Sequence, residues 1–284
     1  MSASRGGRLF VALQYLLPQH GISALVRALT RVRTPWFKNL LVRAFLRAFK
    51  VDLREAALPD PLAYASFNEF FTRALRPGAR PIDPDPASIA SPVDGTVSEC
   101  GPIEGDTLVQ AKGRPYRLGE LLAGQPWAAG FAGGSFLTIY LAPHDYHRIH
   151  MPVRGRLEAA VFVPGRLFSV NAATTRQVPR LFARNERILT LFGTDHGRFA
   201  LVMVGALNVG SMSTVWTGEV AAPAGRAVAP LAAPDLTLEK GAELGRFNMG
   251  STVILLFEAG RARWRPECRS NAPVRVGRAI GGLA

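Results

Sequence analysis

Near the end of the chain a hydroxyl pair follows a glycine, at Gly250, Ser251 and Thr252, directly before an apolar run. The run from Val253 to Phe257 is short, continuous and β-branched at its start, which predicts a buried strand. A serine at the mouth of such a strand can be a turn residue or a nucleophile. As a nucleophile it needs a general base, because an alcohol is a poor nucleophile at its own pKa.

Candidate bases are concentrated in Ala142–Pro152, which contains three of the five histidines. His147 and His150 are three residues apart, and imidazole suits proton transfer near neutral pH. The alternatives are loop histidines that bond to the backbone, or a metal site that includes His144 and Asp145. No second cluster of histidine, cysteine or carboxylate residues completes a coordination sphere, so the sequence predicts no metal.

Asp94 lies in a Pro/Gly turn, SPVDGTV, that leads into another apolar run. An aspartate in such a turn commonly caps the backbone. It can equally orient a histidine, in which case Asp94, either His147 or His150, and Ser251 form a Ser/His/Asp set. Ser251 lacks a G-x-S-x-G elbow and precedes a strand instead of a helix, so the set alone does not identify a hydrolase.

The elements that must position these residues change in type along the chain. Apolar side chains at helical spacing predict three short amphipathic helices within residues 1–50 and a further helix or two over Asp52–Leu75. After a turn-rich connector, Arg76–Pro86, one small helix is predicted at Leu118–Gly124. Strands, mostly antiparallel, are predicted at Thr96–Cys100, Ser135–Leu141, Gly155–Val163, Ile188–Phe192, Ala200–Val204, Val209–Val215 and Ser251–Phe257. The fold class is therefore α+β, with basic helices before a mainly antiparallel, β-rich core.

The first 50 residues are basic and contain no acidic side chain, within a chain whose net charge is +13. Basic helices with apolar faces suit the surface of an anionic membrane; the alternative is that these faces pack on the core. No run approaches the ~20 apolar residues that span a bilayer. A non-catalytic nucleic-acid binder is disfavoured, because the aromatic residues of the basic region recur at core-like spacing and no known binding motif is present.

Several stretches become specific when they are taken together and in order: FNEFFTRALRPGARPI, SPVDGTV, LAPHDYHRIHMPVRG, VPGRLFSVN, LFARNER, VGALNVGSM and KGAELGRFNMGSTVILLF. In this combination the chain closely resembles the phosphatidylserine decarboxylase family, over residues 60–258. The basic front end also resembles the membrane-attachment region of the bacterial members. One departure is Met249, where the family usually carries Leu, Phe or Gly before its Gly-Ser-Thr motif.

The resemblance implies that the chain is a proenzyme that cuts itself between Gly250 and Ser251. Residues 1–250 then form a β chain and residues 251–284 an α chain, whose first residue becomes a pyruvoyl group. By the same motif matching, His150 is the base that activates Ser251, and Asp94 orients His150.

The implied reaction is the decarboxylation of phosphatidylserine to phosphatidylethanolamine, a step of phospholipid biosynthesis. The pyruvoyl ketone forms a Schiff base with the amine of the serine headgroup and acts as an electron sink when CO2 leaves. His147 is the implied donor that reprotonates the carbanion. Tyr140, Ser169 and Asn171 are the implied substrate-binding residues.

The resemblance divides the chain into a membrane-associating helical region, residues 1–58, and a catalytic domain, residues 59–284. It implies a peripheral protein on the cytoplasmic face of the cell membrane, with phosphatidylserine in the bilayer as substrate and no nucleic-acid partner. The β and α chains are expected to stay together after cleavage, and the family allows a homodimer. The main alternative is a peripheral membrane hydrolase that uses Asp94, His150 and Ser251 on lipid esters without cutting itself.

Overall fold

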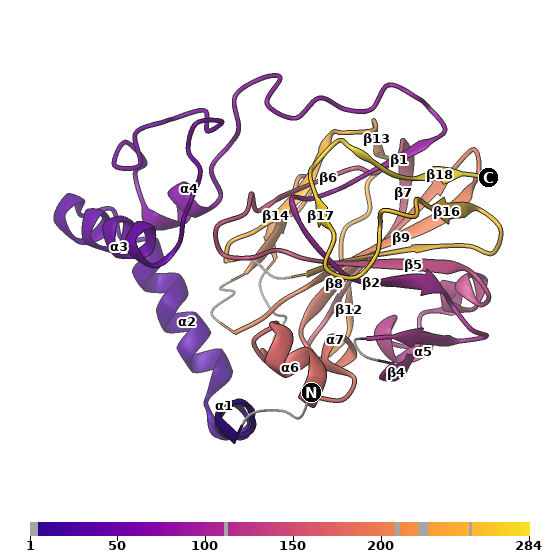
Figure 1. The fold of residues 1–284 in the computed structure, drawn as a ribbon, viewed down its shortest axis with the longest axis horizontal. Coiled ribbons are helices and arrows are strands. Elements are labelled where there is room, and N and C mark those ends of the chain that lie inside the picture. Colours follow the sequence, from indigo (N-terminus) through magenta and orange to yellow (C-terminus); the bar gives the residue numbers. More distant parts are fainter. Residues whose placement is uncertain (1–4, 111–112, 208–210, 221–226, 250–251) are drawn as a thin grey trace.

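The computed structural model describes residues 5–284 apart from 111–112, 208–210, 221–226 and 250–251. Helices α1 (Arg5–Leu16), α2 (Gln19–Thr30) and α3 (Pro35–Ala48) lie to one side of a β-rich body, with α4 (Phe67–Phe71) beside α3 (Figure 1). Short helical elements follow within the body: α5 (Leu118–Leu121), the 3-10 helix η1 (Pro126–Phe131), α6 (Ala172–Gln177) and α7 (Leu181–Arg184).

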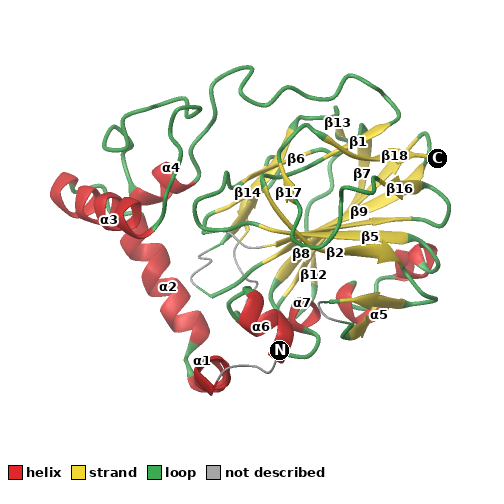
Figure 2. Ribbon diagram, in the orientation of Figure 1, coloured by secondary structure: helices red, strands yellow, loops and turns green. Residues whose placement is uncertain are grey.

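Strands make up most of the body, as the yellow arrows of Figure 2 show. Their bounds are β1 (Ser88–Ala90), β2 (Gly95–Pro102), β3 (Thr107–Val109), β4 (Pro115–Arg117), β5 (Ser135–Tyr140), β6 (Arg148–His150), β7 (Gly155–Val163), β8 (Arg187–Thr194), β9 (Gly197–Val204), β10 (Met212–Thr214), β11 (Gly218–Val220), β12 (Ala229–Pro230), β13 (Thr237–Leu238), β14 (Glu243–Phe247), β15 (Thr252–Phe257), β16 (Ala262–Trp264), β17 (Pro273–Val274) and β18 (Ala279–Leu283).

The largest sheet within the described residues is antiparallel and has the order β12-β7-β8-β9-β15-β5-β2-β17, with β13 also paired to β7. A second sheet, β11-β10-β14-β6, brings β14 beside β6. The two sheets therefore share the connection from β14 to β15, which contains Gly250 and Ser251.

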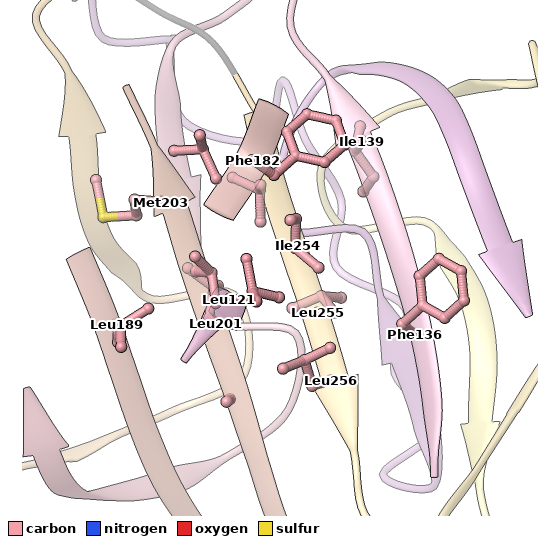
Figure 3. Packing of buried hydrophobic residues seen from close by; sticks show 14 of the residues in the cluster. Leu121, Phe136, Ile139, Phe182, Leu189, Leu201, Met203, Ile254, Leu255 and Leu256 are labelled. Atoms are coloured by element: carbon pink, nitrogen blue, oxygen red, sulfur yellow. The ribbon is translucent and has the colours of Figure 1, made fainter. Parts of the chain in front are cut away.

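Strand β15 lies in the middle of the largest sheet, between β9 and β5. Its first residue, Thr252, lies opposite Val204 on one side and Tyr140 on the other. All its residues are buried, and Figure 3 shows Ile254, Leu255 and Leu256 among the side chains of the core. A strand covered on both faces needs the continuous apolar run that the sequence carries here.

Strand β2 packs closely beside β5 because its first residue is a glycine. A Cβ atom on Gly95 would lie 2.4 Å from the carbonyl oxygen of Tyr140, so a larger residue would push the two strands apart. The close approach brings Asp94, the residue before β2, to the same edge of the sheet as Tyr140.

In helices α1 and α2 most of the buried side chains are polar and the leucines that the structure describes are exposed, although Val11 of α1 is buried in the core. Gln14 of α1 is 1% exposed and Gln19 of α2 is 2% exposed, whereas Leu16 is 83% exposed and Leu25 is 60% exposed. This is the reverse of the usual arrangement for a helix that covers a protein core. The alternative that the apolar faces of these two helices pack on the domain core is therefore wrong for most of their length.

Helix α3 has a mixed environment. Phe45 packs on Phe67, Phe70 and Phe71 of α4, with ring centroids 5.3–6.1 Å apart, while Trp36 on the other face is 71% exposed. The aromatic cluster of α3 and α4 therefore joins the helical region to the β-rich body.

The α+β class is confirmed, and each strand predicted from the sequence is present with shifted bounds; residues 209–210 and 251 of two of them lie outside the described residues. Of the helix or two predicted over Asp52–Leu75, one forms among the described residues, namely α4, which follows its N-cap Ser66; the prediction is wrong for the rest of the range, which is not helical. Pro59 and Pro61 disfavour helical backbone before them, and Asp60 instead accepts a hydrogen bond from the backbone nitrogen of Leu62 at 2.9 Å.

Candidate active site

The bond between Gly250 and Ser251 lies outside the described residues, but the residues on either side locate it. Before it, the side chain of Asn248 is buried and donates to the hydroxyls of Ser211 and Ser213 at 2.9 and 3.0 Å. After it, Thr252 begins β15. Both flanks are thus held by hydrogen bonds to neighbouring segments.

Met249 lines a cavity of about 340 Å³. Four residues selected from the sequence line the same cavity: Tyr140, His147, Ser169 and Asn171. They come from the end of β5, the segment before β6 and the segment before α6, so the fold brings together residues that are distant in sequence. The rest of the lining is mainly apolar and consists of Phe45, Phe49, Phe71, Leu141, Pro143, Val170, Ala206 and Leu207.

His147 is 1% exposed and stacks on the ring of Phe71, with centroids 4.1 Å apart and an interplanar angle of 20°. Its Nε2 lies 3.4 Å from the carbonyl oxygen of Pro143, which can only accept, so Nε2 carries the hydrogen. Nδ1 has no hydrogen-bond partner among the described residues.

Burial lowers the pKa of His147 to about 3, and the nearby charge of Arg73 adds to this effect. The imidazole is therefore neutral at pH 7, with an unprotonated Nδ1 that can take up a proton. Arg73 is itself buried, and its Nη2 donates to the carbonyl oxygens of His144 and Asp145 at 3.1 and 3.3 Å. These bonds help to fix the loop that carries His147.

His150 lies in β6, outside the cavity lining. Its Nδ1 is 2.8 Å from the carbonyl oxygen of Gly241, so Nδ1 donates and Nε2 is left as the acceptor. The hydroxyl of Tyr146 lies 3.0 Å from Nε2 and donates to it. Burial lowers the pKa of His150 and raises that of Tyr146 to about 12, so a neutral histidine faces a protonated phenol.

Asp94 is not hydrogen-bonded to His150 in this structure. Its carboxylate accepts from the guanidinium of Arg80 and, at 2.8 Å, from the backbone nitrogen of Val276. The two segments are nonetheless adjacent, because the backbone nitrogen of His150 donates to the carbonyl oxygen of Pro92, two residues before Asp94, at 2.8 Å. The carbonyl oxygen of Gly241 occupies the orienting position that the sequence pattern suggested for Asp94.

Several residues of this site were missed from the sequence. Tyr146 lies within the histidine-rich segment, where its spacing of four residues from His150 was an available signal. Arg80 and Gly241 carry no local signal, because their partners are 14 and 91 residues away along the chain.

Within the part of the chain that the structure describes, no group of three or more histidine, cysteine or carboxylate residues is arranged to hold a metal ion. Among the same residues, no helix has both the length and the apolar character needed to cross a membrane.

Comparison with known proteins gives a consistent result. A family model described as phosphatidylserine decarboxylase matches residues 67–282, and one described as PSD matches residues 9–50. Three similar relatives are each called phosphatidylserine decarboxylase proenzyme. The protein of Methylococcus capsulatus is 51% identical over 96% of both chains. That of Stutzerimonas stutzeri is 50% identical over 98% of this chain and 95% of its own, and that of Alkalilimnicola ehrlichii 56% identical over 87% and 88%.

Proposed function

The chain belongs to the phosphatidylserine decarboxylase family of lyases, and we propose that it becomes active by cutting its own backbone between Gly250 and Ser251. The observation that carries this proposal is the position of Met249, which borders a cavity lined by His147, Tyr140 and Ser169. A reactive group made at residue 251 would thus form beside residues suited to proton transfer and substrate binding. The word proenzyme in the names of the relatives agrees with this order of events.

In the proposed cleavage, the Ser251 hydroxyl attacks the carbonyl carbon of Gly250, and an N-to-O acyl shift replaces the peptide bond with an ester. Elimination across residue 251 breaks the ester and releases the carboxylate of Gly250. Hydrolysis then releases ammonia and leaves a ketone at the start of the α chain. Glycine suits the attacked position because it carries no side chain to obstruct the nucleophile.

His150 is the proposed base. Its Nδ1–H is held by Gly241, so the lone pair of Nε2 is the one available to take the serine proton. Tyr146 donates to that lone pair in this structure and must move aside, or relay the proton, before His150 can act. Asp94 is the proposed carboxylate partner, although here it is bound to Arg80.

The pyruvoyl group proposed at residue 251 supplies a ketone that condenses with the substrate amine and withdraws the electron pair when CO2 leaves. The residues present fit such a group. His147 lines the same cavity, and its Nδ1 has no hydrogen-bond partner among the described residues. We assign to His147 the return of a proton to the carbon that has lost CO2. Because the imidazole is neutral here, Nδ1 must first gain that proton from a solvent water molecule in the cavity.

Tyr140, Ser169 and Asn171 are the proposed substrate-binding residues, and they supply polar groups to the cavity lining. Phe45 of α3 and Phe49, directly after α3, also line the cavity, and the glycerol and acyl chains are the parts of the lipid that suit such aromatic side chains. Asn171 also has a structural role, because its Oδ1 accepts from the backbone nitrogen of Ala173 at 2.9 Å and caps α6.

We assign residues 1–58 to the membrane surface. The outward faces of α1, α2 and α3 carry the apolar side chains, and the first 50 residues carry basic side chains without any acidic one. Apolar contact and attraction to anionic lipid would then act together, on the cytoplasmic face of the cell membrane. The alternative of a lipid-ester hydrolase predicts the same membrane surface but a chain that remains uncut.

Intact-mass analysis of the purified protein tests the proposal. Cleavage predicts fragments of about 27 and about 4 kDa from the 30.7 kDa chain, the smaller with a carbonyl that hydroxylamine or borohydride modifies. A fully active preparation that is one unbroken chain without a reactive carbonyl would overturn it. Lipid-ester hydrolysis by such a chain would support the hydrolase instead. Light scattering on the same sample tests the homodimer that the family allows.

A further inference from the structure

Two buried glutamines join the helical region to the wall of the cavity. Gln14 of α1 and Gln19 of α2 are 1% and 2% exposed, on helices whose leucines face outward. A buried amide costs free energy unless its polar atoms are hydrogen-bonded, so these side chains need a reason to be inside.

The reason is a set of hydrogen bonds to the segment 165–171. The Oε1 atom of Gln14 accepts from both the backbone nitrogen and the hydroxyl of Ser169, at 2.8 and 3.1 Å. The Oε1 atom of Gln19 accepts from the backbone nitrogen of Leu167 at 2.9 Å, and its Nε2 donates to the carbonyl oxygen of Gln14 at 2.7 Å. His20 Nε2 lies 3.0 Å from the carbonyl oxygen of Gly165.

The same segment supplies Ser169, Val170 and Asn171 to the cavity lining. The Nδ2 atom of Asn171 donates to the Ser169 hydroxyl at 3.3 Å, so the contact continues from Gln14 through Ser169 to Asn171. Around it, the ring of Tyr15 lies 4.8 Å from that of Phe168. The position of this wall therefore depends on the helix pair.

We propose that Gln14 is a positioning residue for decarboxylation, which sets the place of Ser169 in the substrate cavity. The inference rests on the proposed assignment of this cavity as the substrate site. It gives the helix pair a second task besides attachment, because the face opposite the lipid surface shapes the site. Loss of the Gln14 acceptor would leave the backbone nitrogen and the hydroxyl of the half-buried Ser169 without this hydrogen-bond partner.

The structure also shows which atom of Gln14 matters. Its Nε2 is buried and has no partner among the described residues, whereas its Oε1 accepts two bonds. A glutamate buried here takes up a proton, because burial disfavours its charge, and it then supplies the same carbonyl oxygen; methionine has a similar length without that oxygen. Gln14→Glu should therefore preserve the role of Gln14, and Gln14→Met should abolish it.

The test uses the full, self-processed chain and a short-chain phosphatidylserine kept below its micelle concentration, so that membrane attachment does not contribute. We expect Gln14→Met to be cleaved completely and to bind anionic vesicles normally, while kcat/KM on the monomeric lipid falls about tenfold, or ~1.4 kcal/mol. Gln14→Glu should stay within about threefold of the parent. Gln125→Met, at the start of η1 and away from the cavity, is the matched control and should match the parent.

Two results would overturn the inference. One is full activity of Gln14→Met on monomeric lipid with a loss on vesicles alone, since that is the behaviour of a simple anchor. The other is an equal loss of activity in Gln14→Met and Gln14→Glu, which would show that the acceptor oxygen is not the atom that positions Ser169. If Gln14→Met does not fold, Gln19→Met removes the neighbouring bond to Leu167 and should show a smaller loss in the same direction; unchanged activity would also contradict the inference.

Failure of the site assignment gives a different result. If His147→Ala and Ser169→Ala are both cleaved and fully active on the monomeric lipid, the cavity is not the substrate site, whatever Gln14→Met does. If these two variants lose activity and Gln14→Met does not, the site assignment stands and only the proposed positioning role of Gln14 is refuted.

Discussion

Helix α2 and strand β15 place their apolar side chains in opposite directions. In β15 the residues from Val253 to Phe257 are at most 2% exposed and lie between two neighbouring strands. In α2 the buried residues are polar, and Leu25 and Leu29 are 60% and 39% exposed.

The contrast separates apolar surface that the chain buries within itself from apolar surface that only another partner could cover. The position of β15 follows from burial of apolar surface within one molecule. Single exposed leucines are ordinary, but outward apolar side chains on three successive helices form a surface that usually has a partner. The lipid surface proposed above is such a partner, and it would account both for the direction of the faces and for the basic residues between them.

The largest expected effect concerns the start of β15. Ser251→Ala removes the proposed nucleophile, so the variant should remain one uncut chain and lose all decarboxylase activity. A denaturing gel and an assay of CO2 release measure both properties. Ser270→Ala, at an exposed serine of the same carboxyl-terminal segment, should be cut and active. Normal cleavage of Ser251→Ala would refute the assignment.

A matched pair of leucine truncations tests the contrast directly. Leu255→Ala, at 0% exposure in β15, should lower the free energy of unfolding by about 2–5 kcal/mol because it leaves a cavity. Leu16→Ala, at 83% exposure in α1, should change it by less than about 0.5 kcal/mol in the absence of lipid. Urea unfolding measures both. Similar losses in the two variants would mean that the outward face of α1 is covered by protein.

His147 lies where the helical region meets the core, and its burial predicts a pH dependence. The folded side chain stays neutral down to a pKa of about 3, while the unfolded side chain protonates near 6.5. The unfolded state therefore binds more protons between these values, and stability that is complete above pH 6.5 falls by about 1.4 kcal/mol per pH unit below it.

His147→Asn removes this contribution, so its urea midpoint should vary less between pH 7 and pH 5.5 than that of the parent. His196→Asn, at an exposed histidine of the hairpin between β8 and β9, should retain the full slope. An unchanged slope in His147→Asn would show that this imidazole is accessible to protons in the folded protein.

The smallest effect concerns one side chain of the outer surface. Leu25→Gln should weaken binding to anionic vesicles about fivefold, or about 1 kcal/mol, because a leucine only partly inserted in lipid contributes less than the ~1.5–3 kcal/mol of a fully buried one. Sedimentation with vesicles of phosphatidylglycerol measures it. Val228→Gln, at a 46% exposed valine of the β-rich body, is the control and should bind normally. Equal losses in both would place the lipid contact elsewhere.

Local patterns sufficed for much of the fold. Continuous apolar runs predicted β5, β9 and β15, and helical spacing predicted α1 to α3, because in each case the information lies within a few residues. Strands β16 to β18 of the tail were missed, since they are short and form through pairing with other segments: β18 pairs with β1 and β16, and β17 pairs with β2. The direction in which α1 and α2 face was also beyond local patterns, because the partners of Gln14 and Gln19 are about 150 residues away.

The site shows the same limit. Histidines and an aspartate in turns could be selected as candidates from their types, and motif matching added the cavity residues Tyr140, Ser169 and Asn171. The bonds that these groups make were not predictable. Whether Asp94 binds His150 or Arg80 depends on the packing of segments that no local pattern relates.

The central place of β15 bears on when the chain can be cut. The proposed cut between Gly250 and Ser251 would leave a short carboxyl-terminal peptide whose first strand, β15, is paired with β9 and β5 along its whole length. Such a peptide cannot dissociate unless the middle of the sheet opens, and a separately synthesised peptide could not easily insert between β9 and β5. Scission should thus be a one-way step taken by an already folded molecule, and a processed enzyme that has once been unravelled should rarely recover.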